Sequence, residues 1–171
     1  MPNKATSTTQ TLGLTKPSKL EEKHDCTQFD SGQTEINTYL QGGLKQQKLK
    51  NSSIYVVCKV GTLIVKGYYT LSSAEIIRDA APGNLKRGGA PKELSAIKLG
   101  RLGVDKDFQG KGYGKDLLQD AVERCIKASA EIASKAIIVD ALDNKAYKFY
   151  QNAGFKPVDK ISKLTLYLSL L

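Results

Sequence analysis

Hydrophobic and β-branched residues gather in short runs in the first two thirds of the chain. Residues 54–60 and 63–77 form two such runs, separated by Gly61 and Thr62, which predicts a hairpin of two strands with its turn at these residues. A third run over residues 97–104 predicts another strand. The middle of the chain is therefore predicted to be a meander of strands.

The pattern then changes to helical spacing. Six apolar residues form one stripe surrounded by charged and amide side chains: Leu117, Leu118, Ala121, Val122, Cys125 and Ile126. Residues 136–141 predict a short buried strand, and a helix follows that begins at Asp143 or Asn144 and ends before Gly154. Residues 164–170 predict a closing strand. This order predicts one α/β domain with a central mixed, mostly antiparallel sheet flanked by helices.

The N-terminal part is less regular. Residues 1–18 are rich in Ser, Thr and Gln and predict a flexible tail, so the folded domain is expected over residues 19–171. Residues 20–32 are typical of a short strand and turn. Residues 34–50 predict a helix that its first residue can cap and that two central glycines weaken. Residues 78–96 predict one long loop, a feature that is usually functional or mobile in a compact domain.

Composition narrows the class of protein. The chain has 171 residues, 40% hydrophobic and 25% charged, which is typical of one globular domain with its own core. No apolar run approaches the ~20 residues of a membrane span. Three scattered cysteines and one histidine, His24, predict neither a disulfide framework nor a zinc site. Without a secretory signal, we expect a cytoplasmic protein that holds no metal.

Positive charge is concentrated in two segments, and the formal net charge is +9. Residues 86–115 contain eight Lys or Arg and three acids, and residues 145–163 contain five Lys and one acid. Such an excess favours polyanionic partners or ligands. A solvated basic face is the simpler alternative.

A glycine-rich turn joins the strand over residues 97–104 to the long helix. Its sequence is Gln109-Gly-Lys-Gly-Tyr-Gly114. The first amides of a helix have no internal partner and carry the positive end of its dipole, so such a turn is suited to bind a phosphate. Neither common phosphate motif fits, because Asp116 stands where a Walker A loop needs Ser or Thr and Lys115 where a dinucleotide fingerprint needs Gly. A turn that needs glycine only for its geometry is the alternative.

The spacing of this turn resembles the GNAT superfamily of acetyl-CoA-dependent N-acetyltransferases. Three segments carry the resemblance in the family's order: the strand and turn over residues 102–114, the strand over residues 137–141, and the stretch Ala146-x-x-Phe-Tyr-x-x-x-Gly-Phe155. The resemblance implies a GNAT-like fold and acetyl-CoA as co-substrate. It also implies direct attack of a substrate amine on the thioester, with no acyl-enzyme.

The resemblance further implies roles for individual residues. The edge of the strand before the turn would hydrogen-bond the pantetheine arm as an added strand, and the amides of the turn would hold the pyrophosphate. The implied coenzyme site is Leu102, Gly103, Val104, Gln109, Gly110, Lys111, Gly112, Tyr113, Gly114 and Lys115. Tyr150 would be the catalytic residue that returns a proton to the departing thiolate, whereas its spacing alone favours a core aromatic. Many family members have Asn where this chain has Asp143.

No nucleophile or general base stands out from the residues. Cys125 falls on the apolar stripe of its helix, which favours a packing role, and His24 lies far from the motif. Asp105, Asp107 and Glu93 are near the right region, but nothing distinguishes one of them.

A narrower resemblance covers residues 20–170. The segments Phe29-Asp-Ser-Gly32, Ile36-Asn-x-Tyr-Leu40, Gly67-Tyr-Tyr-Thr-Leu-Ser72 and Leu99-Gly-Arg-Leu-Gly-Val-Asp105 are similar to GNAT toxins that acetylate the α-amino group of aminoacyl-tRNA. This resemblance implies aminoacyl-tRNA as substrate, blocked translation, a ribbon-helix-helix antitoxin as partner and a possible homodimer. The basic segments would then contact acceptor-stem phosphates. Two alternatives stay open: acetylation of a protein amine, and a non-catalytic nucleic-acid-binding module on this fold.

Overall fold

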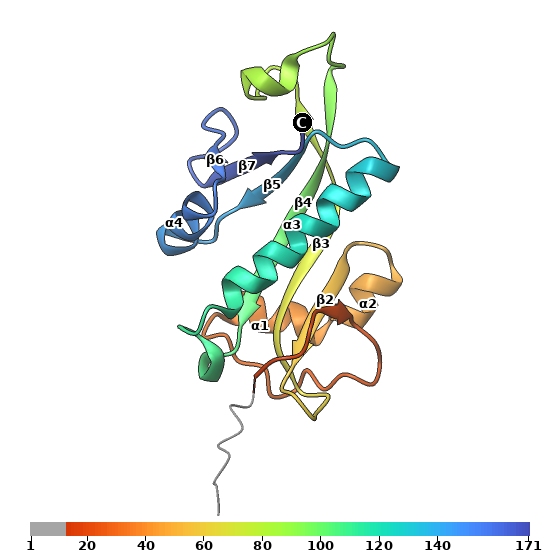
Figure 1. The fold of residues 1–171 in the computed structure, drawn as a ribbon, viewed down its shortest axis with the longest axis vertical. Coiled ribbons are helices and arrows are strands. Elements are labelled where there is room, and N and C mark those ends of the chain that lie inside the picture. Colours follow the sequence, from red (N-terminus) through yellow and green to blue (C-terminus); the bar gives the residue numbers. More distant parts are fainter. Residues whose placement is uncertain (1–12) are drawn as a thin grey trace, which may run out of the picture.

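One seven-stranded sheet runs through the molecule in the computed structural model, which describes residues 13–171 (Figure 1). The strand order is β1-β2-β3-β4-β5-β7-β6, and only the β4–β5 pair is parallel. The elements in chain order are β1 (Ser18–Lys19), α1 (Thr34–Gln41), α2 (Gly43–Lys48), β2 (Ser53–Cys58), β3 (Val65–Ile77), η1 (Gly83–Lys86), β4 (Glu93–Val104), η2 (Lys106–Phe108), α3 (Tyr113–Glu131), β5 (Ala136–Asp140), α4 (Asn144–Asn152), β6 (Lys156–Pro157) and β7 (Thr165–Ser169). The predicted mixed, mostly antiparallel sheet is confirmed.

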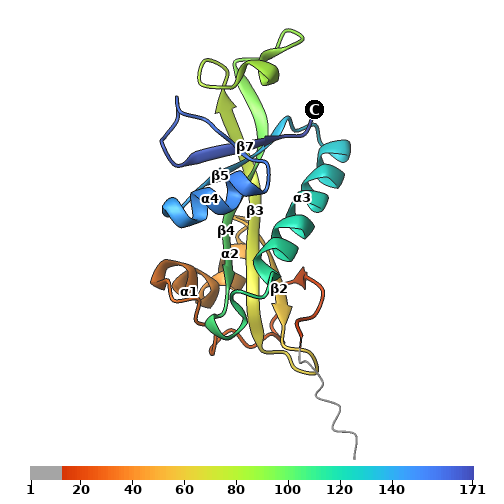
Figure 2. The ribbon, with the colours of Figure 1, turned by 60° about the vertical axis from the view of Figure 1, so that its left-hand side comes forward.

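Helices cover both faces of the sheet. Alternate residues of β2 and β3 point to opposite sides, so the buried residues of these strands need a covering helix on each face. Val57 and Tyr69 pack with α3 in one core cluster, which also contains Tyr150 of α4. Val56 and Tyr68 pack on the other face, in the cluster that contains the buried side of α1. Figure 2 shows α1 and α3 on opposite sides of the strands.

The helix predicted over residues 34–50 is broken into α1 and α2 at Gly42. Thr34 is the first helical residue, and the cap position is taken by Gln33, whose side chain makes no capping hydrogen bond, so the expected Thr34 cap was wrong. The predicted strand within residues 20–32 is also wrong. The strand lies just before this segment, at Ser18 and Lys19 of β1, and the segment itself has a single bridge at Asp25.

The segment before β1 is tied to the sheet from residue 13 onward. Leu14 bridges to Lys59, and the hydroxyl of Thr15 accepts a hydrogen bond from the amide of Cys58 at 2.9 Å. Arg124 of α3 donates to the carbonyl of Pro17 at 3.2 Å. Of the tail expected over residues 1–18, the first twelve residues lie outside the described part of the chain, and the last six lie along β2.

The loop predicted over residues 78–96 is shorter than expected and carries structure. β4 begins at Glu93, because its first residues pair with the end of β3 and extend the two strands into an arm. The short helix η1 closes the arm and buries Leu85 in a small separate core with Leu94. The arm rises beyond the end of β7 in Figure 1.

None of the helices in the described part of the chain has the length and apolar character that a membrane span needs.

A bulge in β4 shapes the centre of the sheet. Tyr69 pairs with Leu102 and Leu71 with Leu99, so two residues of β4, Gly100 and Arg101, oppose the single residue Thr70 of β3. The hydroxyl of Thr70 accepts a hydrogen bond from the Arg101 amide at 3.0 Å, and a Cβ at Gly100 would lie only 2.7 Å from that oxygen. The bulge therefore requires glycine at this position.

β4 and β5 separate directly before the bulge. Their pairing covers only residues 96–98 of β4 and 136–138 of β5. Beyond Lys98, β4 has no strand partner on that side among the described residues, and the sheet opens. The split places a strand edge in the middle of the molecule.

Candidate active site at the split in the sheet

A cavity of about 410 Å³ lies along the split. Its walls come from the unpaired end of β4, the glycine-rich turn, the starts of α3 and α4, and the region around the start of α1. The lining residues are Ser31, Gln33, Ile36, Leu102, Gly103, Val104, Phe108, Gln109, Gly110, Gly112, Tyr113, Gly114, Lys115, Asp143, Lys145, Ala146 and Phe149. The structure thus brings together nine of the ten residues predicted for the coenzyme site, all except Lys111.

The turn presents unsatisfied backbone amides to this cavity. Gly110 and Gly112 have φ of 73° and 89°, in the left-handed region that favours glycine, and a Cβ on either would meet nothing within 4 Å. Gly112 is the N-cap of α3 and supplies no side-chain acceptor, so the first amides of this 19-residue helix have none from the cap. With Lys115 beside them, these amides could hold a phosphate or pyrophosphate.

Lys111 has a different environment. Its ammonium group donates to the carbonyl of Asp107 at 3.3 Å and lies 5.5 Å from the centre of the Phe108 ring. Its side chain therefore supports the turn from outside the cavity.

The Gln109 side chain holds the turn in place. Its amide nitrogen donates to the carbonyls of Ser31 and Val104, both at 2.8 Å. One side chain thus ties the turn to the end of β4 and to the segment before α1. This positioning role was not predicted from the sequence.

Asp143 caps α4 at the edge of the cavity. Its carboxylate accepts a hydrogen bond from the amide of Ala146 at 2.8 Å, and both residues line the cavity. The predicted capping role is confirmed. Gly154, at φ 95°, follows the end of α4 as expected.

Tyr150 lies behind the cavity wall. Its side chain is 6% exposed and packs against Phe149 and Phe155, with ring centres 5.2 and 5.6 Å away. Burial raises the pKa of Tyr150 well above its ordinary value near 10, so the phenol is protonated throughout the physiological range. Its hydroxyl makes no hydrogen bond within the described residues, and Phe149, its neighbour on α4, lines the cavity instead.

The acidic residues near the motif have no common role. Asp105 is buried and accepts hydrogen bonds from the amides of Asp30 and Asp107 and from Lys66, at 3.0, 3.1 and 3.3 Å. It is therefore a structural residue that joins three segments. Glu93 begins β4 at the far end of the strand from the cavity.

The free cysteines are also far from nucleophilic. Cys125 lies on the side of α3 that faces the core and is fully buried, and burial raises the pKa of its thiol to about 12. The packing role predicted for it is confirmed. Ile126, which was assigned to the same stripe, is 53% exposed.

A second cavity, of about 440 Å³, continues along the same split. It is formed in part by the middle of β4 and by the end of β5 with the two residues that follow it. The lining is Glu35, Tyr39, Asn51, Ser52, Thr70, Ser72, Lys98, Gly100, Arg101, Asp140, Ala141 and Leu142. Sequence reasoning missed this cavity. The available signal was Gly100, because an isolated glycine within a strand pattern indicates a bulge.

Comparison with known proteins places this architecture. Residues 50–157 match the model of the acetyltransferase (GNAT) domain. The chain belongs to the GNAT acetyltransferase family. The resemblance predicted from the glycine turn and the Phe-Tyr stretch is thereby confirmed, together with the GNAT-like fold and the acetyltransferase class.

Several relatives of this GNAT protein are toxins. A tRNA-acetylating toxin from Mycobacterium tuberculosis is 34% identical, and the match covers 90% of this chain and 93% of the toxin. The structure of AtaT complexed with acetyl-methionyl-tRNAfMet has a TM-score of 0.84 at 30% identity, covering 92% and 95% of the two chains. A tyrosine-to-phenylalanine mutant of AtaT, bound to the C-terminus of the antitoxin AtaR and acetyl-CoA, has a TM-score of 0.77 at 27% identity, covering 92% and 94%.

Proposed function

We propose that this protein is a toxin that transfers the acetyl group of acetyl-CoA to the α-amino group of aminoacyl-tRNA and so blocks translation. The observation that carries the proposal is similarity along nearly the whole chain to a tRNA-acetylating toxin and to AtaT bound to its acetylated tRNA. The two adjoining cavities at the split support it, because a transferase needs two substrates to meet.

Acetyl-CoA fits the cavity lined by the glycine turn. Amides of the turn and the start of α3, with Lys115, would hold the pyrophosphate, and the free edge of β4 from Leu102 to Val104 would pair with the pantetheine arm. Bound acetyl-CoA supplies an activated acetyl thioester. The chain contributes position, a polarising backbone amide near Val104 and a proton donor.

The substrate amine attacks directly in this mechanism. Its lone pair forms the C–N bond and the C–S bond breaks. The amine proton leaves to water, the thiolate takes a proton from Tyr150, and Tyr150 regains a proton from water. An α-amino group has a pKa near 8, so a fraction is neutral without a dedicated base. Because burial raises its pKa, the Tyr150 phenol stays protonated at every pH at which the amine reacts. Cys125 takes no part.

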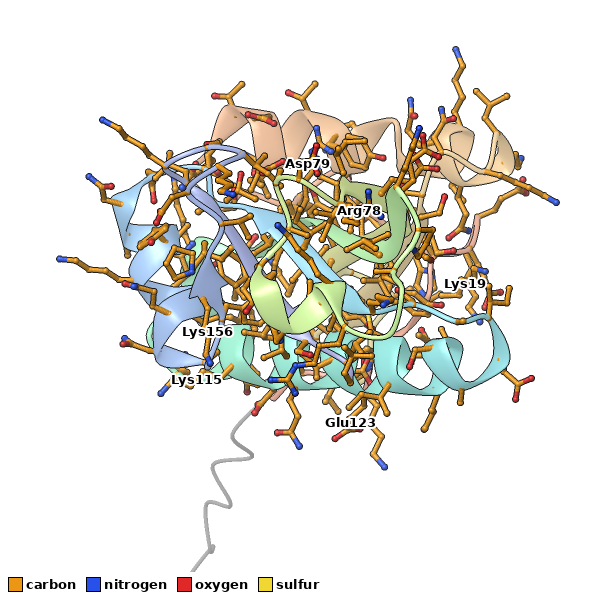
Figure 3. The ribbon with its side chains drawn as sticks, turned by 90° about the horizontal axis from the view of Figure 1, so that it is seen from above. Lys19, Arg78, Asp79, Lys115, Glu123 and Lys156 are labelled. Carbon is orange, nitrogen blue, oxygen red and sulfur yellow. The ribbon has the colours of Figure 1, made fainter. Side chains whose placement is uncertain are left out.

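Unpaired lysines support a tRNA partner. Within the described residues, Lys145, Lys148, Lys156 and Lys163 form no ion pair, whereas Lys98 and two other cations of the first basic segment pair with acids. Figure 3 shows Lys115 and Lys156 on the side where α4 lies. Such lysines suit the phosphates of an acceptor stem.

The relatives also indicate partners and location. AtaT is bound to the C-terminus of the antitoxin AtaR in a solved structure. We expect a ribbon-helix-helix antitoxin to bind this protein, and a homodimer is compatible with the fold. Because charged tRNA is cytoplasmic, the toxin would act there.

The deciding experiment measures transfer from labelled acetyl-CoA to charged total tRNA, with deacylated tRNA beside it. Wild type, Tyr150→Phe and the matched control Tyr147→Phe, a second tyrosine of α4 that packs against the same core cluster, are compared. We expect label only on charged tRNA, with loss in Tyr150→Phe and not in the control. Label that appears on protein amines instead, and that ribonuclease does not remove, would show that the substrate is a protein and not tRNA. The assignment as an acetyltransferase would stand.

A further inference from the structure

The two cavities occupy consecutive lengths of one split. Lys98, Gly100, Arg101 and residues 140–142 line the second cavity, whereas residues 102–104 and the start of α4 from Asp143 contribute to the coenzyme cavity. They meet where Arg101 is followed by Leu102 and Leu142 by Asp143. An acceptor in the second cavity therefore approaches an acetyl group carried along the free edge of β4.

The charge of the second cavity limits what it can hold. Its lining contains two acids, Glu35 and Asp140, and two cations, Lys98 and Arg101. Lys98 and Asp140 pair closely at 2.9 Å, whereas Arg101 reaches Glu35 at 3.4 Å, a long contact to a half-exposed carboxylate. The balance disfavours a polyphosphate and leaves Arg101 as the available cation.

Arg101 is held ready by its neighbours. Its guanidinium lies over the Tyr39 ring, 3.8 Å from the ring centre, and the Tyr39 hydroxyl is fixed by Ser52 at 2.7 Å. Its Nε is buried and has no hydrogen-bond acceptor within the described residues. An arginine that is stacked in this way and lines the cavity is suited to bind a phosphate through the terminal nitrogens of its planar guanidinium.

We propose that the second cavity binds the terminal aminoacylated nucleotide of the tRNA, and that Arg101 pairs with the single phosphate that precedes that nucleotide. The inference rests on the proposed function and deepens it. The terminal aminoacyl-adenosine is a compact polar ligand with one phosphate, which matches a neutral cavity of this size with one available cation. The rest of the tRNA stays outside, on the lysine-rich surface.

The test uses two small acceptors that differ only in that phosphate. Both are 3′-aminoacylamido-adenosines carrying the amino acid found on the acetylated tRNA, one with a 5′-phosphate and one without. We expect wild type to prefer the phosphorylated acceptor in kcat/KM by roughly 10- to 100-fold, the worth of a charge-assisted hydrogen bond. Arg101→Met should abolish the preference, and Arg101→Lys should restore only part of it because a lysine lacks the fork.

The partner variant Glu35→Gln separates binding from structure. If the ion pair only attaches α1 to the sheet, both variants lose stability and neither changes the preference for the phosphate. If Arg101 binds the phosphate, Glu35→Gln frees the guanidinium and keeps or increases the preference, opposite to Arg101→Met. The dissociation constant for acetyl-CoA and the melting temperature are measured for each variant, with Lys127→Met on the exposed side of α3 as the charge-loss control.

Each result decides the matter. A preference lost in Arg101→Met and retained in Glu35→Gln and Lys127→Met supports the inference. Equal use of both acceptors by wild type, or a preference that survives in Arg101→Met, overturns it and leaves the proposed function intact. If wild type acetylates neither charged tRNA nor either acceptor, the proposed function fails and this assignment fails with it.

Discussion

Substituting Gly103 by Ala tests how closely α1 packs against the strand that forms the active site. A Cβ on Gly103 would lie 2.5 Å from Cγ2 of Ile36 and 3.6 Å from the Phe29 ring, both buried side chains. Carbon atoms in contact prefer about 3.5–4.0 Å, so α1 would have to move by roughly 1 Å. Overpacking of this kind costs about 1–3 kcal/mol, which lowers the melting temperature by about 2–12 °C in a domain of this size.

A double-mutant cycle attributes the cost to this one contact. Ile36→Ala removes the clashing methyl group and alone should cost about 2–5 kcal/mol. Gly103→Ala combined with Ile36→Ala should be less destabilised than the sum of the two by about 1–3 kcal/mol. Urea denaturation measures all four proteins. Since both residues line the coenzyme cavity, Gly103→Ala should also weaken acetyl-CoA binding in calorimetry.

Gly83→Ala is the matched control. A Cβ there would meet nothing within 4 Å, and the backbone of Gly83 is outside the left-handed region. Its stability should therefore change by less than about 0.5 kcal/mol or rise slightly. Equal effects of the two glycine substitutions, or additive energies in the cycle, would show that the packing of α1 on β4 is not as described.

Three further predictions concern Tyr150, Cys125 and Asp30. Tyr150→Phe should lower kcat by roughly 100-fold or more with little change in acetyl-CoA affinity. Because burial raises the pKa of Tyr150, wild-type activity should show no loss from phenol ionisation below about pH 10. A descending limb of the pH–rate profile near pH 8 that disappears in the variant would contradict this. Cys125→Ala should keep the transfer rate of the wild type while losing about 1 kcal/mol of stability. The native Cys125 thiol, with its pKa of about 12, should resist alkylation at pH 8. Rapid labelling would argue against its burial. Hydrogen bonds from Lys106, the Gly32 amide and Asn37 lower the pKa of Asp30 to about 2. The stabilising contribution of Asp30 is therefore complete above its unfolded pKa near 4 and is lost as the pH falls toward 2. Carboxyl NMR should show this pKa rising in Lys106→Met, and an unchanged value would refute the pairing.

Local patterns predicted the parts of the site that local sequence determines. The apolar stripe of α3, the glycine turn before it and the Asp143 cap depend on residues close together in the chain, and the structure contains all three. Arg101 was not recognised as a candidate, because its stacking on Tyr39 brings together residues 62 positions apart.

The failures have the same physical origin. Asp105 was considered as a base, yet its burial beside Lys66 arises only when β3, β4 and the segment before α1 come together. The start of β4 was placed too late, because pairing with β3 extends a strand that lacks a strong apolar run of its own. Whether Tyr150 donates the proton remains a prediction from the family resemblance.

The bulge at Gly100 and Arg101 makes the shape of the sheet depend on how many residues β4 contains at this point. Between its paired positions, β4 has two residues where β3 has one. Deleting one of the two residues would leave a single residue opposite Thr70, so β4 would pair one to one with β3 and the bulge would be lost. Most single-residue replacements leave this number unchanged, whereas the loss of one codon at this point would remove the bulge. The number of residues in β4 at this point, as well as their side chains, therefore shapes the second cavity, which Thr70, Gly100 and Arg101 line.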